Sequence, residues 1–141
     1  MKKACPERSR GAFTLIEILL AIFVLEIGLL GIAGFYTYSF KITKTARMET
    51  TAANLASGLL DEQLANAYDN IAVGSGDRTP YSPDENDPFH TFDKKIDVTY
   101  VDVNLVEQTT DTHMKKIVVM IYWQVEGADK SFQTASIKAQ H

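Results

Sequence analysis

The feature that most constrains this 141-residue chain is an apolar run close to its N-terminus. The 28 residues from Phe13 to Phe40 contain only two charged side chains, Glu17 and Glu26. Residues 13–36 alone would form a helix about 36 Å long, which is enough to cross the hydrocarbon core of a bilayer. We therefore expect a membrane-spanning helix that anchors a small soluble head.

A short basic segment precedes this run. Residues 1–12 have a net charge of +3, whereas the remainder of the chain has ten basic and seventeen acidic residues, a net charge of −7. Positive charge keeps its end of a span in the cytoplasm, so we expect the leader inside and the head outside. Lys41, Lys44 and Arg47 weaken this asymmetry because they follow the far end of the run. No small-residue cleavage site follows the run, so we expect the apolar segment to be retained.

The helix is expected to continue beyond the membrane, because no proline occurs between Ala12 and Arg78. At about 100° per residue, the following residues place one apolar stripe along the helix. The stripe consists of Ile42, Ala46, Ala53, Ala56, Leu60, Leu64, Ala67 and Ile71. The sequence thus predicts one helix from about residue 13 to about residue 70. Its apolar half is 13–40, and its amphipathic half lies within 41–72.

Residues 73–141 are predicted to form the head. Gly74 and Gly76 are expected to end the helix, and the Gly-, Pro- and Asp-rich stretch 74–88 indicates a loop. Alternating apolar residues after this loop predict about three strands. An antiparallel sheet of these strands would pack against the apolar stripe of the helix, which gives an α+β fold.

The strand expected at 115–125 is apolar on both faces. Its two faces are Ile117, Val119, Ile121, Trp123 and Val125, and Val118, Met120 and Tyr122. One helix covers only one face of a sheet. We therefore expect the second face to be covered by the 73–95 loop or by a neighbouring subunit.

The two flanking strands have weaker patterns. The earlier one alternates as Ile96, Val98 and Tyr100, then shifts phase to Val101, Val103 and Leu105, which indicates a bulge or twist. The later one, 131–139, has Ala135 and Ile137 on its apolar face. Turns are expected at 108–112 and 126–129.

The beginning of the apolar run carries a specific motif. Gly11-Ala12-Phe13-Thr14-Leu15-Ile16-Glu17 follows the basic leader and opens the apolar helix. This arrangement resembles the N-terminal methylation motif of type IV pilins, whose fold is a long N-terminal helix carrying an antiparallel sheet. Residues 25–34 look most like minor pilins of the PilV type and the protein I pseudopilins of type II secretion. The resemblance covers residues 1–72, and the head only by architecture.

The resemblance implies a processing site. A prepilin peptidase would cleave between Ala12 and Phe13, and the new amine of Phe13 would be N-methylated. The family usually has Gly before the cut, where this chain has Ala12. Cleavage between Gly11 and Ala12 is the alternative, but it would place Glu17 at mature position six instead of five. We favour cleavage before Phe13, since a small alanine fits the same kind of pocket.

Glu17 and Glu26 are the candidate assembly residues. A carboxylate in an apolar segment costs a few kcal/mol and normally needs a partner. In the resembling family, the residue that matches Glu17 pairs with the N-terminal amine of a neighbouring subunit; otherwise Glu17 would simply lie near the headgroups. Glu26 follows nine residues later, on the opposite side of the helix. It either contacts a different subunit or forms a hydrogen bond as a neutral carboxyl within the bundle.

Three glycines punctuate the apolar helix at three-residue spacing, at Gly28, Gly31 and Gly34. They either permit local unwinding in a filament or allow close helix contact. Gly34 occupies the place of the mid-helix proline that is common in major pilins, which favours a minor subunit.

The other chemical candidates are weak. The single cysteine, Cys5, excludes an internal disulfide and a CxxC site. The loop acids between Asp77 and Asp87 lack the ligand spacing of a helix–loop–helix calcium site. The histidines, His90, His113 and His141, show no metal-ligand spacing. We find no nucleophile or phosphate-binding motif, and we expect no enzyme activity, metal or cofactor.

The resemblance therefore implies a structural minor subunit of a type IV pilus or related filament. It would reside in the inner membrane as a single-pass protein and then in the filament. Its implied partners are other pilin subunits, the prepilin peptidase, the inner-membrane assembly platform and, before assembly, membrane lipid. A minor pseudopilin of type II secretion is the alternative. A DNA-binding minor pilin is less favoured, because a net charge of −7 beyond the leader opposes nucleic-acid binding.

Overall fold

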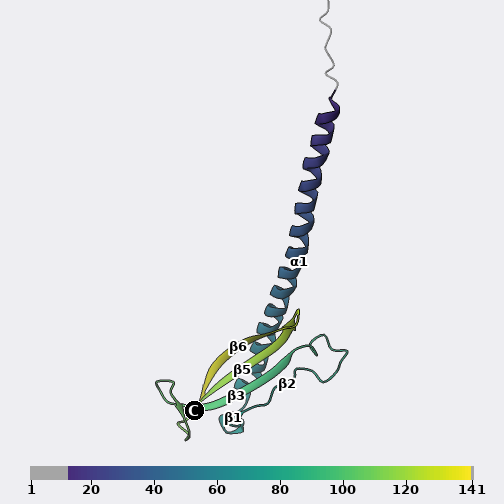
Figure 1. Ribbon diagram of the computed structural model, residues 1–141. Helices are drawn as coiled ribbons and strands as arrows, with labels where there is room; N and C mark the ends of the chain where they lie inside the picture. Colours follow the sequence, from purple (N-terminus) through teal and green to yellow (C-terminus); the bar gives the residue numbers. More distant parts are fainter. Residues whose placement is uncertain (1–12, 141) are drawn as a thin grey trace, which may run out of the picture. The chain divides into compact units, whose positions relative to one another are not determined.

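The computed structural model describes residues 13–140. They form an α+β arrangement of a long N-terminal helix, a short 3-10 helix and a six-stranded antiparallel sheet (Figure 1). The elements are α1 (Leu15–Ala65), η1 (Tyr68–Asn70), β1 (Gly74–Ser75), β2 (Thr79–Pro80), β3 (Asp93–Val101), β4 (Glu107–Gln108), β5 (Met114–Val125) and β6 (Ala128–Ala139). The chain divides into two compact units, with the boundary between Ile42 and Thr43.

The described part of the first unit is the apolar portion of α1. Its side chains are exposed on every side, and an 18-residue window of α1 has a mean hydropathy of 2.6. A helix that is apolar all round is normally covered by lipid or by other helices. This helix is long and apolar enough to cross a membrane, as the sequence predicts.

The second unit contains the remainder of α1, one face of which packs against the sheet. The buried helix residues are Ala52, Leu55, Ala56, Leu59 and Leu60. The predicted stripe shares Ala56 and Leu60 with this face, but Ala46 and Ala67 are exposed. The prediction was wrong at Ala46 because burial free energy scales with apolar area, so the leucines decide which face turns inward. It was also wrong at Ala67, which lies beyond the end of α1, and at Ile42, which is exposed in the first unit.

The helix also ends earlier than predicted. α1 stops at Ala65 rather than near residue 70, and η1 follows after an extended residue, Ala67. Ile71 is nevertheless buried in the same core as Leu60. The chain thus completes the helix-side core with a separate short turn.

The sheet has β5 at its centre. The strand order is β1-β3-β5-β6, and the short strands β2 and β4 also pair with β3. β5 and β6 form an antiparallel hairpin whose turn has positive φ at Glu126 (52°) and Gly127 (80°). Two successive positive φ values suit the right-handed twist of a two-residue hairpin, and Gly127 adopts one at no steric cost. The turn predicted at 126–129 is confirmed here.

Three details of the head differ from the sequence prediction. The stretch 74–88 is not wholly a loop, because β1 and β2 lie within it and pair with β3. β3 ends at Val101, so Val103 and Leu105 lie in the next loop, where they are exposed. Ala135 and Ile137 of β6 are also exposed. The half-buried residues of β6 are instead Phe132, Thr134, Ser136, Lys138 and Ala139.

The predicted inner face of β5 is confirmed. Ile117, Val119 and Ile121 are fully buried, and Trp123 packs with Phe92 at a ring-centroid distance of 6.2 Å. The opposite face is half-buried. On it, the guanidinium of Arg78 lies 4.6 Å from the ring centroid of Tyr122. The 73–95 segment therefore contacts Tyr122, whereas Val118 and Met120 line an open hollow. The predicted cover by this segment is confirmed for Tyr122 only.

Candidate functional site

The predicted processing site lies mostly beyond the described part of the chain. The leader 1–12, with Gly11 and Ala12, is outside the described residues. Phe13 is described: it precedes α1 and has 75% of its surface exposed. An exposed residue just before a helix is accessible to an enzyme acting on its amide or amine.

Thr14 determines where α1 begins. The backbone N–H of Glu17 donates to the carbonyl of Thr14 at 3.0 Å and lies 3.4 Å from its hydroxyl oxygen. Thr14 and Glu17 thus occupy the first and last positions of a capping box, in which Ser or Thr caps the helix and Glu follows three residues later. The sequence contains this signal as Thr-Leu-Ile-Glu, so Glu17 has a capping position in addition to its expected place in assembly or near the headgroups.

The position of Glu17 also reduces the cost of its charge. It is the acidic residue in the first turn of α1, where unpaired backbone N–H groups give the helix end a partial positive charge. Glu26 has no such advantage, because it lies well inside α1. The structure therefore separates the two candidate carboxylates: Glu17 is compensated by its own helix, and Glu26 is not.

The three helix glycines, Gly28, Gly31 and Gly34, lie within a continuous stretch of α1. A Cβ atom added at any of them would meet no atom within 4 Å. Nothing in the described chain therefore requires glycine at these positions. Unwinding in a filament and close contact with another helix both stay predictions.

The C-terminal end of α1 receives its cations from the sheet. α1 has no basic residue in its last turn, but Lys138 of β6 donates from Nζ to the carbonyl of Leu64 at 2.8 Å. Lys115 of β5 donates to the carbonyls of Tyr68 and Ile71, both at 2.8 Å. Lys138 therefore satisfies an acceptor at the end of α1 and counters its negative end. Lys115 instead satisfies carbonyls of η1 and of Ile71, the residue that follows it.

Lys115 is the buried charged side chain of the described head, with only 4% of its surface exposed. Its Nζ also lies 4.1 Å from the ring centroid of Tyr68, within range of a cation–π interaction. Sequence reasoning missed this residue. The available signal was its phase, because Lys115 shares the inward face of β5 with Ile117.

A tyrosine–aspartate pair closes this end of the head. The hydroxyl of Tyr68 donates to Asp111 Oδ1 at 2.6 Å, and the backbone N–H of His113 donates to the same oxygen at 2.8 Å. Burial, followed by the bond to Asp111, raises the pKa of Tyr68. The bond from Tyr68 lowers the pKa of Asp111. Asp111 is therefore an anion that holds Tyr68, and thereby η1, against the sheet.

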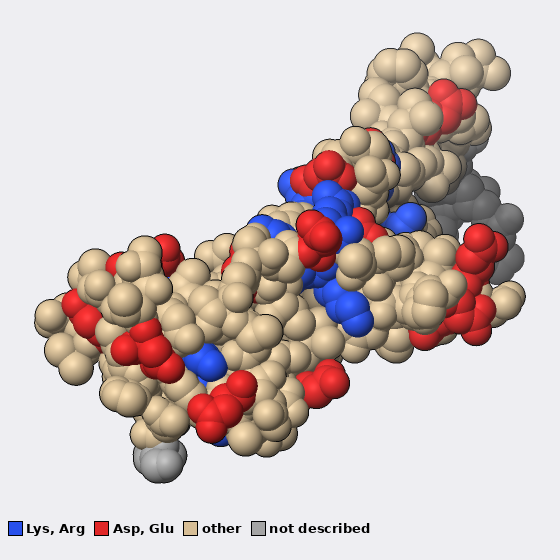
Figure 2. All heavy atoms as spheres, turned by 90° about the horizontal axis from the view of Figure 1, so that it is seen from below, with Lys and Arg blue, Asp and Glu red and all other residues tan. Residues whose placement is uncertain are grey.

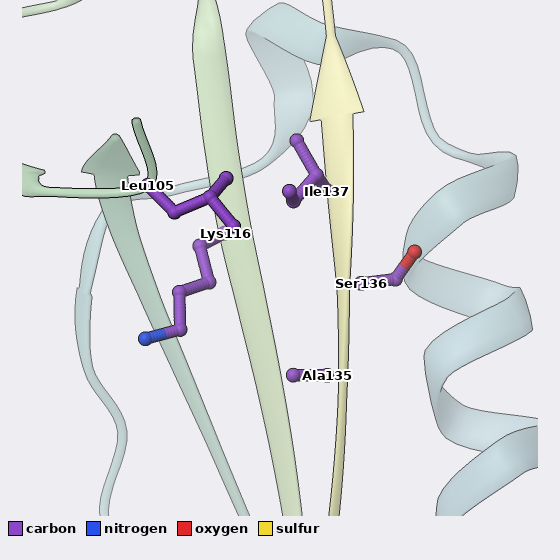
Figure 3. A pocket seen from close by; sticks show the side chains of 5 residues that line it. All are labelled: Leu105, Lys116, Ala135, Ser136 and Ile137. Carbon is purple, nitrogen blue, oxygen red and sulfur yellow. The ribbon is translucent and has the colours of Figure 1, made fainter. Parts of the chain in front are cut away.

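An open hollow of about 560 Å³ lies on the face of the sheet away from the helix. Figure 3 shows Ala135 and Ile137 pointing toward the side of Leu105, whereas Ser136 points toward the helix. Leu105 has a positive φ of 63°, and its loop is held by Asp102, whose Oδ1 accepts the backbone N–H of Val106 at 2.9 Å. This ordered loop presents apolar side chains to solvent, a feature typical of contact surfaces.

The acidic loop is organised by its own hydrogen bonds. Asp84 Oδ1 accepts the backbone N–H of Asn86 at 2.9 Å and its side-chain amide at 3.1 Å, and the backbone bond lowers the pKa of Asp84. His90 and His113 bond to Asp87 and Gln140 through Nδ1, and His141 lies outside the described residues. Among residues 13–140 no group of three His, Cys, Asp or Glu side chains is placed to hold a metal ion.

The surface drawn in Figure 2 carries both basic and acidic side chains. On this face, lysine and arginine side chains lie among acidic ones. Arg78 pairs with Asp93 at 2.7 Å, and Lys95 pairs with Asp97 at 2.9 Å. Paired cations are less available to phosphates than a continuous basic stripe would be.

Comparisons of the chain with protein-family models, with characterised proteins and with solved structures find no match.

Proposed function

We propose that this chain is a structural minor subunit of a type IV pilus or a related filament, such as a type II secretion pseudopilus. It is held in the membrane by its apolar helix, processed before Phe13 by a prepilin peptidase, and assembled through helix packing. Assembly would involve other subunits and a membrane platform rather than catalysis.

One observation carries the proposal: an apolar helix begins at a capped Phe-Thr-Leu-Ile-Glu sequence and continues into the core of a separate head. The cap fixes the helix start at Thr14, and the buried turns from Ala52 to Leu60 belong to the head. One helix therefore supplies both an apolar segment for membrane or filament and a scaffold for the sheet. Cleavage just before this capped start would create a new amine on Phe13 and would leave Glu17 at mature position five, the spacing of the motif.

Processing provides the first prediction. When the full chain is produced with a prepilin peptidase, mass spectrometry of the membrane or filament fraction should find a methylated Phe13 at the N-terminus. Ala12→Gly should be cleaved at the same bond, whereas a bulky residue in Ala12→Leu should block cleavage. An N-terminus at Ala12, or retention of Met1 in assembled filaments, contradicts the assignment.

Two variants of Glu17 separate its capping role from its proposed docking role. Glu17→Gln keeps a residue that suits the capping box but removes the charge, and Glu17→Leu removes both. If docking needs the charge, both variants should insert into the membrane yet fail to enter filaments. Incorporation of Glu17→Gln at the wild-type level would show that charge pairing is not required.

A further inference from the structure

Glu26 lies at a place where its own helix offers it no partner. It follows Phe13 by thirteen residues, about 20 Å along the helix and well inside a hydrocarbon core about 30 Å thick. Backbone N–H groups in the middle of a helix are already bonded within the helix. A carboxyl group at this depth therefore needs a hydrogen-bond partner from another molecule.

The face that carries Glu26 is otherwise apolar. We call it the Glu26 seam; its members are Leu19, Ile22, Glu26, Leu29 and Ala33. They recur three and four residues apart, which is the spacing by which two helices wind around each other. The opposite side of the helix carries Glu17, Ala21, Gly28 and Gly31. The two carboxylates therefore belong to two different surfaces of the helix.

Spacing alone does not select a seam, because this helix is apolar on every side. Glu26 selects it. A single polar residue within an apolar helix seam fixes the register of the partners, since any shift leaves that residue facing hydrocarbon. Leu19, Ile22 and Leu29 on the same face have 55%, 47% and 57% of their surfaces exposed in the isolated chain, so a partner has area to bury.

The sequence itself supplies one matching occupant. Between Leu15 and Phe35 the only polar side chains are Glu17 and Glu26. Two copies inserted with their heads on the same side of the membrane lie parallel and at the same depth. Glu26 of one copy then meets Glu26 of the other, and the O–H of one neutral carboxyl donates to a carboxyl oxygen of its partner.

We propose that this chain pairs with a second copy of itself in the membrane, in parallel, through the Glu26 seam. The inference rests on the proposed function only for the membrane-inserted state. It adds a specific contact on the side of the helix opposite Glu17, and this contact forms before assembly.

Site-directed disulfide formation in lipid vesicles tests which face pairs. Using the full-length chain with Cys5→Ser, single cysteines are introduced on the seam, as Ile22→Cys or Leu29→Cys. Matched controls on the opposite face are Val24→Cys and Phe35→Cys. Oxidation should give covalent dimers for the two seam positions and not for the controls. Equal crosslinking on both faces would overturn the proposal.

The role of the carboxyl is tested by energy transfer between labelled copies as the lipid-to-protein ratio rises. Glu26→Leu should weaken dimerisation about fivefold to thirtyfold, the range expected for an interhelical hydrogen bond in a membrane. Glu26→Gln should stay close to wild type, because two amides also pair, and Glu17→Leu should leave dimerisation unchanged. Wild-type affinity in Glu26→Leu would refute the role of the carboxyl.

The remaining outcomes distinguish this inference from the proposed function. A wild-type chain that stays monomeric in vesicles overturns pairing with a second copy, even if it crosslinks through Ile22→Cys to a different subunit. A chain that is processed at Phe13 and enters filaments without ever dimerising defeats this inference alone. A chain that dimerises through the seam but is never processed upholds the inference and defeats the proposed function.

Discussion

Replacing Lys115 by methionine should destabilise the head more than any other single removal of a surface or core charge. Methionine fills a similar volume, but the carbonyls of Tyr68 and Ile71 lose a donor at 2.8 Å each. The carbonyl of Tyr68 keeps the backbone N–H of Ile71 at 3.3 Å, so the acceptor left unpaired is the carbonyl of Ile71. A buried acceptor left unpaired costs about 1–3 kcal/mol, and the cation–π contact with Tyr68 adds about 1 kcal/mol. Removing a buried ammonium also relieves its desolvation cost, so we expect a net loss of about 2–4 kcal/mol.

The melting temperature of the head measures this loss. For a domain of this size, such a change lowers the melting temperature by roughly 10–20 °C. Trp123 is the single tryptophan and is buried beside Phe92, so its fluorescence in the full-length chain reports on the head alone. The unfolding transition in detergent or vesicles should therefore move sharply downward for Lys115→Met.

Lys116→Met is the matched control. Lys116 is the next residue of β5, faces the other side of the sheet and pairs only with Glu107 in the described chain, at 3.4 Å. An exposed pair of this kind contributes less than about 1 kcal/mol. If Lys115→Met and Lys116→Met melt at the same temperature, the cap on the carbonyls of η1 does not stabilise the head.

Two further predictions concern the same end of the head and the strand β1. Because the pKa of Tyr68 is raised in the folded head, its contribution to stability is complete below about pH 10 and is lost as the pH rises further. Tyr68→Phe should therefore flatten the fall in melting temperature between pH 9 and pH 11. Parallel curves for the two proteins would contradict this. Gly76→Ala would place a Cβ 2.7 Å from the carbonyl oxygen of Ile96 and should lower the stability of the head by about 1–3 kcal/mol, with faster amide exchange around β1. The control Gly58→Ala, in open space on α1, should raise the stability by about 0.5–1 kcal/mol. Equal amide exchange around β1 in the two variants would count against the close approach at Gly76.

The parts of the fold that the sequence predicts correctly are those with strong apolar patterns. The grouping of Ile117, Val119, Ile121 and Trp123 on one face of β5 follows from the two-residue period of a strand, which places alternate side chains on the same side of the sheet. The apolar portion of α1 follows from its composition alone. The hairpin turn follows from Gly127, which accepts a positive φ.

The errors occur where side chains are small or amphipathic. Ala135 and Ile137 suggest an inward face for β6, yet Phe132 and the stem of Lys138 turn inward instead. Phe132 has the larger apolar area, and Lys138 gains a carbonyl of α1 as an acceptor. The pairing partner across the chain decides the face, and a single strand does not contain that information.

The candidate site divides in the same way. Glu17 stands out in the sequence as a charge in an apolar run, and its capping role follows from the Thr14 spacing once both residues are considered together. Lys115 and Tyr68 are 47 positions apart, so only the folded chain brings them into contact. The entropy cost of closing this loop depends on its length and not on the identity of the two residues, so local sequence patterns do not indicate the contact.

The two carboxylates differ in how far their free energy depends on a neighbouring helix. Glu17 gains from the positive end of α1 whether or not a partner is present, so its charge costs little in the isolated chain. Glu26 gains nothing until a partner arrives, and the difference in free energy between the unpaired and paired states is therefore larger at Glu26. Specificity depends on such differences rather than on absolute affinity. Of the two residues, Glu26 is the one whose replacement should change which neighbour the helix selects, whereas Glu17 lies in the capped first turn of α1.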